Sequence, residues 1–492
     1  MSVALEKATD YGSARKRAEK GGYFMKRKVL SALLCTAMTV GMLAGCGSAS
    51  ADSSSETSAS AGSSSQAQDS AGASESAAAA GDSAASATAS SVDYSKDSGE
   101  IYMFISSPEY ADAINTLIDQ YKQVAPNVTI NYETTQNDYP TMLKAKINSG
   151  KVPDIFSSTS GKEIDTYREY SYDLSKEPLM NTIDPAVADT MKSPELGTGC
   201  YGIAIKGNYF GMVYNKDILT ECGVTEFPTT QKAMIDACEK IAAKGYKPFT
   251  TGYSEWWVFK HVWQHFLDAA AADAGIEPSE LVSKFEKGEA KISDYPELYT
   301  NFFNFIDLTV KYGDDKPLET DLSAEEAAFA NGKAAMVCGQ GAWIEGDVKA
   351  INDKINIGFN GYPVTDDASQ CQVIAGSDQA LHVNKDSKNL QATLDFVNWW
   401  YTSDYGMSWF TDVAGVVPPI KTTAQSDFAI IQQGNELSAS NGAAPLSVCY
   451  STDSWHQTFG QLMQAYIAGT TDKDATCDAI QKQWQAIDGA SN

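Results

Sequence analysis

The sequence predicts an α/β protein, because segments of strand length alternate with segments of helical periodicity along its first folded stretch. In Tyr110–Val124 apolar side chains recur at helical spacing, whereas Val128–Tyr132 alternates as a strand does. The alternating segments are, in chain order, Ile101–Ser106 (strand), Tyr110–Val124 (helix), Val128–Tyr132 (strand), Tyr139–Ser149 (helix) and Val152–Phe156 (strand). This rhythm is typical of βαβ units in a parallel sheet. About 400 residues follow Asp97, which is enough for two domains of ~150 residues each.

Polar loops follow two of these predicted strands. Ser106-Ser107 comes directly after the first strand, and Ser157–Ser160 comes after the third. In parallel sheets, ligands lie beyond the carboxyl ends of the strands. The sequence therefore predicts that these two loops form one edge of a cleft.

The N-terminal part of the chain has the features of an export signal. The basic segment Met25–Lys28 precedes the apolar run Val29–Leu43, which is shorter than the ~20 residues of a transmembrane helix. Charge, apolar core and small residues in this order predict a signal peptide at residues 25–45. Leu43–Cys46 resembles a bacterial lipobox, and this resemblance implies lipid attachment to Cys46.

Two segments flank this signal. Residues 1–24 are either a non-native extension from an over-long reading frame or an extension that the protein tolerates. Residues 46–96 are dominated by Ser and Ala, and such a composition cannot bury enough apolar surface to offset chain entropy. We expect a disordered tether here, and an exported protein that is anchored to the outer face of the bacterial cytoplasmic membrane through its lipid alone.

The charge and cysteine content limit the partners. The 63 Asp and Glu residues outnumber the 37 Lys and Arg residues, which gives a formal net charge of −26. This charge argues against nucleic acid and anionic membrane surfaces as partners. As a separate expectation, the protein is a monomer. Nine cysteines occur, but without C-x-x-C spacing, so we expect neither a metal site, nor a cofactor, nor a disulfide framework.

His261 and His265 are the one pair of histidines at helical i, i+4 spacing, which could present both to a single metal. The motif H-E-x-x-H is absent, and no third ligand lies in register, so packing in a core helix is the preferred interpretation. The sequence also contains no G-x-S-x-G nucleophile motif and no P-loop.

The stretch Phe329–Trp343 has the features of a binding-site wall. The short apolar strand Ala334–Cys338 leads into Gly339–Ala342, which has almost no side chains, and then into Trp343. Glycine lets a backbone approach a ligand closely, and a flat aromatic after a strand can form one wall of a cleft. The alternative is a core strand, a turn and a tryptophan that serves packing alone.

One further segment carries a specific family resemblance. Tyr201–Gly223, which reads YGIAIKGNYFGMVYNKDILTECG, resembles the signature of the family 1 extracellular solute-binding proteins, lipoproteins that feed sugar ABC importers. The other segments that fit this family, in the expected order along the chain, are Val152–Phe156, Phe329–Trp343, Leu390–Phe410 with Ala414–Pro418, and Phe459–Trp484. The resemblance covers the chain from the lipobox onward.

The resemblance implies a periplasmic-binding-protein-like α/β fold, with two lobes around a hinged ligand cleft and several chain crossings. It places lobe 1 at residues 97–208 plus 378–414 and lobe 2 at residues 210–374 plus 418–492. The crossings then fall near Tyr209, Ala375–Ser377 and Gly415–Val417. Two of these contain glycine at breaks between apolar runs, where a hinge can absorb backbone rotation.

A sugar site needs flat aromatic rings for the C–H faces of the sugar and short polar groups for its hydroxyls. Trp256 and Trp257 are adjacent, so both cannot face one core stripe of a helix. We expect one of them to face the ligand, with no preference between the two. The resemblance places Trp343 in the cleft, and Trp455, just before a predicted helix, is a further candidate.

The polar candidates lie at the predicted crossings and on loops of lobe 1. They are Asn208, Ser377 and Asp378 at the crossings, and Ser107, Glu109, Asp138 and Ser158 on the loops. Each could instead be an ordinary turn or cap residue, and Asp138 directly precedes a predicted helix that it could cap.

These features lead us to expect a binding protein and not an enzyme. The expected function is that of an extracellular substrate-binding lipoprotein of an ABC importer, which binds a carbohydrate, in the first instance an oligosaccharide, and delivers it to the permease subunits. Two alternatives stay open: a receptor for a non-sugar solute, and a secreted glycoside hydrolase. Glycoside hydrolysis needs two carboxylates about 5–10 Å apart, and nothing in the sequence points to such a pair.

Overall fold

The computed structural model describes residues 92–423 and 426–487. The predicted signal peptide, Cys46 and the predicted tether as far as residue 91 therefore lie outside the described residues. No helix of the described part is both long and apolar enough to cross a membrane. The seven cysteines within these ranges are free thiols.

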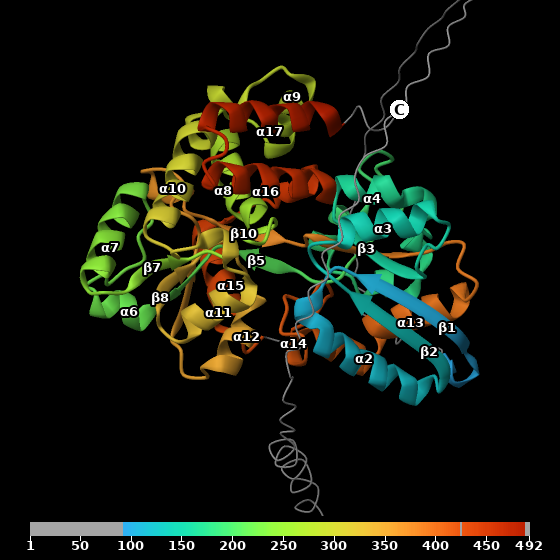
Figure 1. Ribbon diagram of the computed structural model, residues 1–492. Coiled ribbons are helices and arrows are strands. Elements are labelled where there is room, and N and C mark those ends of the chain that lie inside the picture. The colour runs from blue at the N-terminus through green and yellow to red at the C-terminus, as the bar shows by residue number, and fades with distance from the viewer. Residues whose placement is uncertain (1–91, 424–425, 488–492) are drawn as a thin grey trace, which may run out of the picture. The chain divides into compact units, whose positions relative to one another are not determined.

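The described body has two halves, each built around one larger sheet, and a five-stranded sheet organises the first of them (Figure 1). The first half means this sheet and the helices that cover it, including segments from late in the sequence. In spatial order its strands are β2 (Asn127–Thr134), β1 (Ser98–Ile105), β3 (Ile155–Thr159), β11 (Gln379–Val383) and β4 (Ile203–Ala204). β1 runs parallel to both β2 and β3, whereas β11 is antiparallel to β3 and β4. The parallel strands and the intervening helices confirm the α/β class that the sequence predicts.

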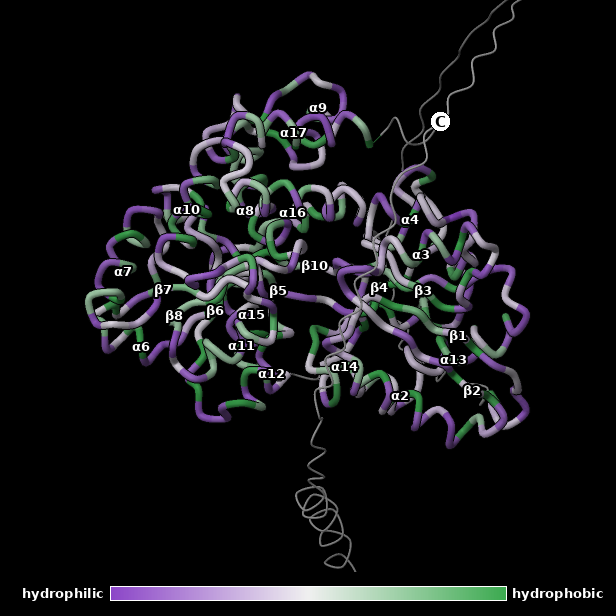
Figure 2. The backbone as a smooth tube through the Cα atoms, viewed as in Figure 1, coloured by the Kyte–Doolittle hydropathy of each residue, from purple (hydrophilic) through white to green (hydrophobic). Residues whose placement is uncertain are grey.

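Helices cover both faces of this sheet because successive side chains of a strand point to opposite faces. Met103 of β1 packs in one cluster with Leu117 and Phe396, whereas its neighbour Phe104 packs in another cluster with Tyr139. The first face is covered by α2 (Ala111–Val124), α13 (Leu390–Thr402) and α14 (Asp404–Asp412), and the second by α3 (Tyr139–Asn148) and α4 (Lys162–Tyr167). Figure 2 shows apolar residues on the strands and polar residues on the outer turns.

A four-stranded sheet organises the second half. Its strands are β7 (Lys247–Thr250), β8 (Ala334–Val337), β6 (Met212–Asn215) and β9 (Ile357–Asn360), in this spatial order. Its helices are α6 (Lys216–Glu221), α7 (Gln231–Ala243), α8 (Val258–Asp273), α9 (Pro278–Lys287), α10 (Phe303–Lys311), α11 (Leu322–Ala330), α12 (Ile344–Ile351), α15 (Ala429–Asn441), α16 (Asp453–Ile467) and α17 (Lys473–Ile487). The short helix α5 (Pro185–Ala188) follows the first three parallel strands along the chain.

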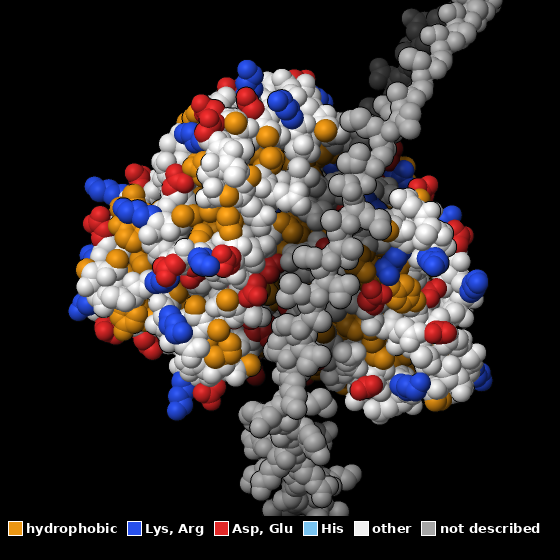
Figure 3. Space-filling view, viewed as in Figure 1, with side chains coloured by type: hydrophobic (Ala, Val, Ile, Leu, Met, Phe, Trp, Pro, Cys, Tyr) orange, Lys and Arg blue, Asp and Glu red, His pale blue; other side chains and the backbone are white. Residues whose placement is uncertain are grey.

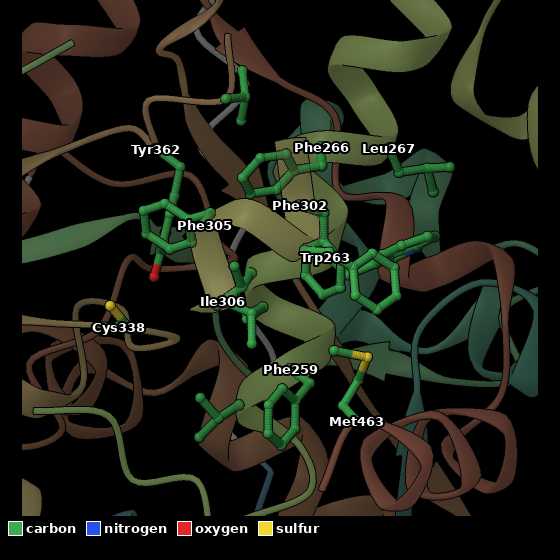
Figure 4. Packing of buried hydrophobic residues seen from close by; sticks show 14 of the residues in the cluster. Phe259, Trp263, Phe266, Leu267, Phe302, Phe305, Ile306, Cys338, Tyr362 and Met463 are labelled. Atoms are coloured by element: carbon green, nitrogen blue, oxygen red, sulfur yellow. The ribbon is translucent and has the colours of Figure 1, made fainter. Parts of the chain in front are cut away.

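Helix α8 is buried at the centre of the second half. Trp263 and Phe266 of this helix pack against Phe302, with ring centroids 4.9 and 5.5 Å apart. Figure 4 shows these rings with Phe305 and Met463, which come from α10 and α16. Aromatic residues therefore fix the helix that begins directly after Trp256 and Trp257.

The two halves are joined by a small sheet of β12 (Ala443–Ala444), β10 (Val373–Gly376) and β5 (Asn208–Phe210). Tyr209 lies opposite Ala375 in the antiparallel pair of β5 and β10, and an isolated bridge joins Gly207 to Val417. The three segments near which the sequence places chain crossings thus lie side by side.

On the face drawn in Figure 3, acidic and basic side chains are interspersed over both halves.

Helix α16 crosses the loop before α8 at a glycine. A Cβ atom on Gly460 would lie 2.3 Å from the carbonyl oxygen of Trp256 and 2.7 Å from its Cβ atom. Real Cβ atoms do not approach other atoms this closely, so the crossing requires glycine in the middle of the helix. This contact sets the distance between α16 and the backbone that carries Trp256.

We predict that Gly460→Ala destabilises the protein by about 1–3 kcal/mol, because the added methyl group overpacks this crossing. The matched control is Gly346→Ala in the exposed part of α12, where the nearest atom to a new Cβ is Phe428 at 3.6 Å. That change is expected to be neutral or to stabilise by up to ~1 kcal/mol, the usual gain from alanine in a helix. Urea denaturation of both variants tests this; equal midpoints would contradict it.

Candidate functional site

A cavity of about 340 Å³ lies between elements of the first and second halves. The loops after β1 and β2 and the last three residues of β3 form one side of it, at the carboxyl ends of the three parallel strands. Its lining residues are Ser106, Pro108, Glu109, Thr135, Gln136, Asn137, Asp138, Ser157, Ser158, Thr159, Lys206, Asn208, Glu255, Trp256, Trp257, Lys260, His261, Leu322, Trp343, Asp378, Gln379 and Asp453. Both predicted segments thus contribute to one edge of this cavity, but Ser157–Thr159 belongs to strand β3 and is not the loop that the sequence predicted.

Two tryptophans and a histidine form the aromatic wall. The ring centroid of Trp343 lies 5.5 Å from that of His261 and 6.4 Å from that of Trp257, in edge-to-face arrangements. Phe210 of β5 packs against Trp343 from another side, at 5.6 Å. Trp256 also lines the cavity, and its Nε1 donates to the carbonyl oxygen of Asn137 at 3.4 Å. Both members of the Trp256-Trp257 pair therefore face the cavity.

The glycine-rich turn before Trp343 packs closely against Trp343 itself. A Cβ atom on Gly341 would lie 2.1 Å from Cζ3 of Trp343 and 2.5 Å from the carbonyl oxygen of Tyr209. The sequence suggested that these glycines let the backbone approach a ligand; the structure shows that Gly341 instead makes room for the indole. Trp343 can occupy its position because residue 341 has no side chain.

Four buried polar atoms of the lining have no hydrogen-bond partner. Two are donors, Nδ2 of Asn208 and Nε1 of Trp257, and two are acceptors, Nε2 of His261 and Oδ1 of Asp378. Buried polar groups are normally paired, and each unpaired one costs about 1–3 kcal/mol. Unpaired donors and acceptors around one cavity are the arrangement expected where a ligand completes the hydrogen bonds.

The tautomer of His261 follows from its neighbours. Its Nδ1 lies 2.9 Å from the carbonyl oxygen of Gly339, and a carbonyl can only accept, so Nδ1 carries the proton. Burial, followed by the positive charge of Lys260, holds the pKa of His261 well below 6.5, so the ring is neutral at neutral pH. Nε2 is therefore an acceptor, which a hydroxyl or N–H group of a ligand can satisfy.

Each lysine of the lining is close to a carboxylate. Lys206 Nζ lies 3.0 Å from Glu109 Oε1 and also lies over the ring of Tyr110, while Lys260 Nζ lies 3.6 Å from Asp453 Oδ1. Both lysines are buried. The cavity therefore offers no lysine without an ion-pair partner to an anionic ligand. Among the described residues, no cluster of three or more His, Cys, Asp or Glu side chains could hold a metal ion.

Hydrogen bonds cross the cavity from one half to the other. Thr159 Oγ1, at the end of β3, donates to Asp453 Oδ1 at 2.6 Å, and Asn137 Nδ2 donates to Glu255 Oε2 at 2.6 Å. Burial alone would raise the pKa of Asp453, but the positive charge of Lys260 and the hydrogen bonds that Asp453 makes hold this pKa below its usual range. The structure thus has the two sides of the cavity in contact.

Most of the site residues expected from the sequence line this cavity: Trp343, Trp256, Trp257, Asn208, Asp378, Glu109, Asp138 and Ser158. Asp138 occupies the position before α3, but its side chain accepts no capping hydrogen bond. Ser158 is hydrogen-bonded to His382, with its Oγ 2.7 Å from the ring Nε2.

Three expected site residues lie outside the lining. Ser107 is buried and donates to Gln379 Oε1 at 2.6 Å, and Ser377 is buried with its Oγ 3.2 Å from the carbonyl oxygen of Gln379. Trp455 packs in the core of the second half, with its ring centroid 3.9 Å from that of Trp484. The expectation that Trp455 precedes a helix and reaches the cavity is wrong, because Trp455 lies inside α16 and faces the core.

The sequence reasoning missed several lining residues, among them Lys206, Lys260, His261 and Asp453. The spacing of His261 and His265 favoured packing in a core helix over a metal pair, whereas the structure has His261 in the cavity lining. One signal could have found it: His261 follows Trp257 by four residues, so both side chains lie on one face of a helix. Asp453 had no such signal, because it reaches the cavity from a distant helix.

Comparison with known proteins defines the family. The sequence pattern of the bacterial extracellular solute-binding proteins matches residues 116–438, so the chain belongs to this family. Its members are binding proteins, and this membership confirms the expectation that the protein is not an enzyme. No curated protein matches the chain in sequence.

Several solved structures have the same fold, and the three described here match over their whole length. A chitin oligosaccharide binding protein matches with a TM-score of 0.69 and 19% identity over 80% of this chain and 100% of that chain. A sugar transporter from Bacillus licheniformis, in complex with stachyose, matches with a TM-score of 0.67 and 19% identity, over 79% of this chain and 100% of that chain. The solute-binding protein RafE, in complex with raffinose, matches with a TM-score of 0.66 and 16% identity, over 79% of this chain and 100% of that chain. These similarities confirm the periplasmic-binding-protein-like fold.

Glu163 of α4 is a buried carboxyl group whose protonation can be tested through the pH dependence of stability. Its carboxylate is buried, accepts from the Thr159 amide at 2.8 Å, and lies near the Asp453 carboxylate. Burial, and then the negative charge of Asp453, raise the pKa of Glu163 to about 8.

We predict that Glu163→Gln removes a pH-dependent loss of stability. In the wild type, the folded state holds a proton that the unfolded state releases, so the free energy of unfolding falls between roughly pH 5 and 8, by about 1.4 kcal/mol per pH unit, relative to the variant. Glutamine keeps an oxygen for the Thr159 amide. Urea denaturation from pH 5 to 9 measures the difference; parallel pH profiles for the two proteins would contradict it.

Proposed function

We propose that this protein is a receptor of an ABC importer that binds a neutral carbohydrate, a short oligosaccharide, in the cavity and delivers it to the permease. The observation that carries the proposal is the combination, in the lining of one cavity, of tryptophan rings with buried, unpaired donors and acceptors. Rings suit the C–H faces of sugars, and the unpaired groups suit their hydroxyls.

Hydroxyl groups match the mixed character of the unpaired atoms. A hydroxyl both donates and accepts, so a ligand with several hydroxyls can accept from Asn208 and Trp257 while it donates to His261 and Asp378. An apolar ligand would leave these atoms unpaired and so lose affinity. The set of unpaired atoms therefore favours a polyhydroxylated ligand.

The charges of the lining support a neutral ligand. Lys206 and Lys260 are close to Glu109 and Asp453, so an anionic ligand would have to compete with these carboxylates. Asp138, Glu255 and Asp378 add further negative charge to the lining. A phosphate ester or an acidic peptide is therefore disfavoured relative to a sugar.

The size of the cavity and the similar structures support an oligosaccharide. The volume of about 340 Å³ lies at the lower end of the ~300–1,000 Å³ typical of small-molecule sites. The similar structures include a chitin oligosaccharide binding protein and complexes with stachyose and raffinose. A short oligosaccharide agrees with both observations.

The proposal includes hinged closure of two lobes, with lobe 1 at residues 97–208 plus 378–414 and lobe 2 at residues 210–374 plus 418–492. The sheet strands divide in the same way, and β5, β10 and the Gly207–Val417 bridge lie where the chain passes between the halves. A ligand that contacts both sides binds the closed state better and so drives closure.

The proposal also includes export, removal of residues 25–45 and lipid attachment to Cys46, so that the monomeric receptor is tethered to the outer face of the membrane. It rests on the sequence of the signal and lipobox. The membership in an extracellular solute-binding family supports it.

A thermal-shift screen of mono-, di- and oligosaccharides against the purified protein tests the ligand class. At a ligand concentration of ~100 times Kd, a bound sugar is expected to stabilise the folded state by about 2.7 kcal/mol. Polyols, phosphate esters and peptides form the comparison set. Stabilisation by one of these and by no sugar would overturn the carbohydrate assignment.

Truncation of the aromatic wall is expected to weaken binding selectively. Trp343→Ala should lower affinity for the stabilising sugar by about 30-fold or more, the ~2 kcal/mol of an aromatic hot spot. The matched control is Trp455→Phe, which keeps a ring at a tryptophan outside the cavity and should leave affinity unchanged. Isothermal titration calorimetry measures both variants; a folded Trp343→Ala protein with wild-type affinity would show that Trp343 does not contact the ligand.

A further inference from the structure

Glu325 is a buried carboxyl group that does not line the cavity. It lies on α11, its exposed fraction is 0%, and one of its oxygens, Oε1, has no hydrogen-bond partner. Its other oxygen, Oε2, accepts from Nε2 of Gln340 at 2.6 Å. A carboxyl group with so few partners is costly to bury, which raises the question of what this contact does.

Gln340 connects Glu325 to the aromatic wall. It is also fully buried, and its Oε1 accepts from Nε1 of Trp343 at 3.0 Å. An indole N–H can only donate, so the amide oxygen of Gln340 must face Trp343 and its NH₂ group must face Glu325. The three side chains therefore form one hydrogen-bonded chain with a fixed direction, from the Trp343 N–H through Gln340 to the Glu325 carboxyl group.

These hydrogen bonds fix the rotation of the Trp343 ring, which the ring contacts around it leave open. Phe210, Trp257 and His261 meet its ring at their edges and faces without a hydrogen bond, and the backbone of Gly341 lies against the ring. The bond to Gln340 is the hydrogen bond described for the indole N–H. It selects one rotation of the ring among those that an aromatic pocket permits.

We propose that Glu325, although outside the cavity, is a positioning residue that sets the orientation of the Trp343 indole through Gln340 and thereby the affinity of the site. The part on affinity rests on the proposed function, whereas the part on orientation does not. The role of Glu325 is to hold the amide of Gln340, since without this acceptor the amide can rotate and present its NH₂ group to the indole N–H.

The protonation state of Glu325 makes glutamine its matched replacement. Burial raises the pKa of Glu325 well above its usual range, and the neighbouring Glu326, Asp314 and Glu255 carboxylates add to the effect. At neutral pH the group is therefore a neutral carboxylic acid, whose carbonyl oxygen accepts from Gln340. Glutamine keeps this oxygen and the shape, whereas methionine keeps only the size.

The experiment compares Glu325→Gln and Glu325→Met by near-ultraviolet circular dichroism of the ligand-free protein and by titration with the sugar found in the screen. Glu325→Met should change the tryptophan band and weaken binding about tenfold, the factor for one buried hydrogen bond. Glu325→Gln should retain both wild-type values. In a Trp343→Phe background, Glu325→Met should leave the remaining tryptophan band unchanged.

Glu326→Met is the matched control, because it removes the adjacent buried carboxyl group of the same helix, whereas the amide of Gln340 donates to Glu325. It should preserve the band and the affinity. A wild-type band in Glu325→Met, or a change that persists in the Trp343→Phe background, would overturn the orientation; unchanged affinity would overturn its effect on binding. If no sugar binds the wild type, the proposed function fails while the dichroism still decides the orientation. Gln340→Met breaks the same chain should Glu325→Met not fold.

Discussion

The position of the Trp343 indole is the constraint on which the cavity depends. This ring is partly buried, and it packs against the hydrophobic clusters of both sheets as well as against the small cluster around Phe210 and Ile374. No larger residue than glycine fits at position 341 beneath it. The wall of the site is therefore built by core packing before any ligand arrives, and such preorganisation lowers the cost of binding.

Unpaired buried polar atoms occur at several places in the described residues, and four of them belong to the cavity lining. Buried polar groups are usually paired, yet Asn208, Trp257, His261 and Asp378 each leave one atom without a partner on the same small volume. The tightly packed aromatic core around α8 offsets this cost. What sets these four atoms apart is that they line one cavity, where a ligand can supply the missing partners.

The contacts across the cavity link binding to the arrangement of the two halves. Thr159 ends one strand of the first sheet and Asn137 follows another, whereas Asp453 and Glu255 belong to the other half. The hydrogen bonds between them exist only when the two sides meet. A ligand between the same surfaces adds interactions to this state alone. This geometry supports the proposed coupling of closure and binding in a member of the solute-binding family.

Local sequence determined the elements and part of the site. The alternation from residue 101 predicted the parallel strands, whose shared edge brings Glu109, Asp138 and Ser158 to one cavity. The adjacency of Trp256 and Trp257 led to the expectation that one of them faces the ligand, and both line the cavity. Tertiary structure alone decided that Trp455 packs on Trp484 and that Asp453 reaches Thr159, 294 residues away. Periodicity shows which face of an element is apolar, but which elements meet depends on contacts between distant parts of the chain.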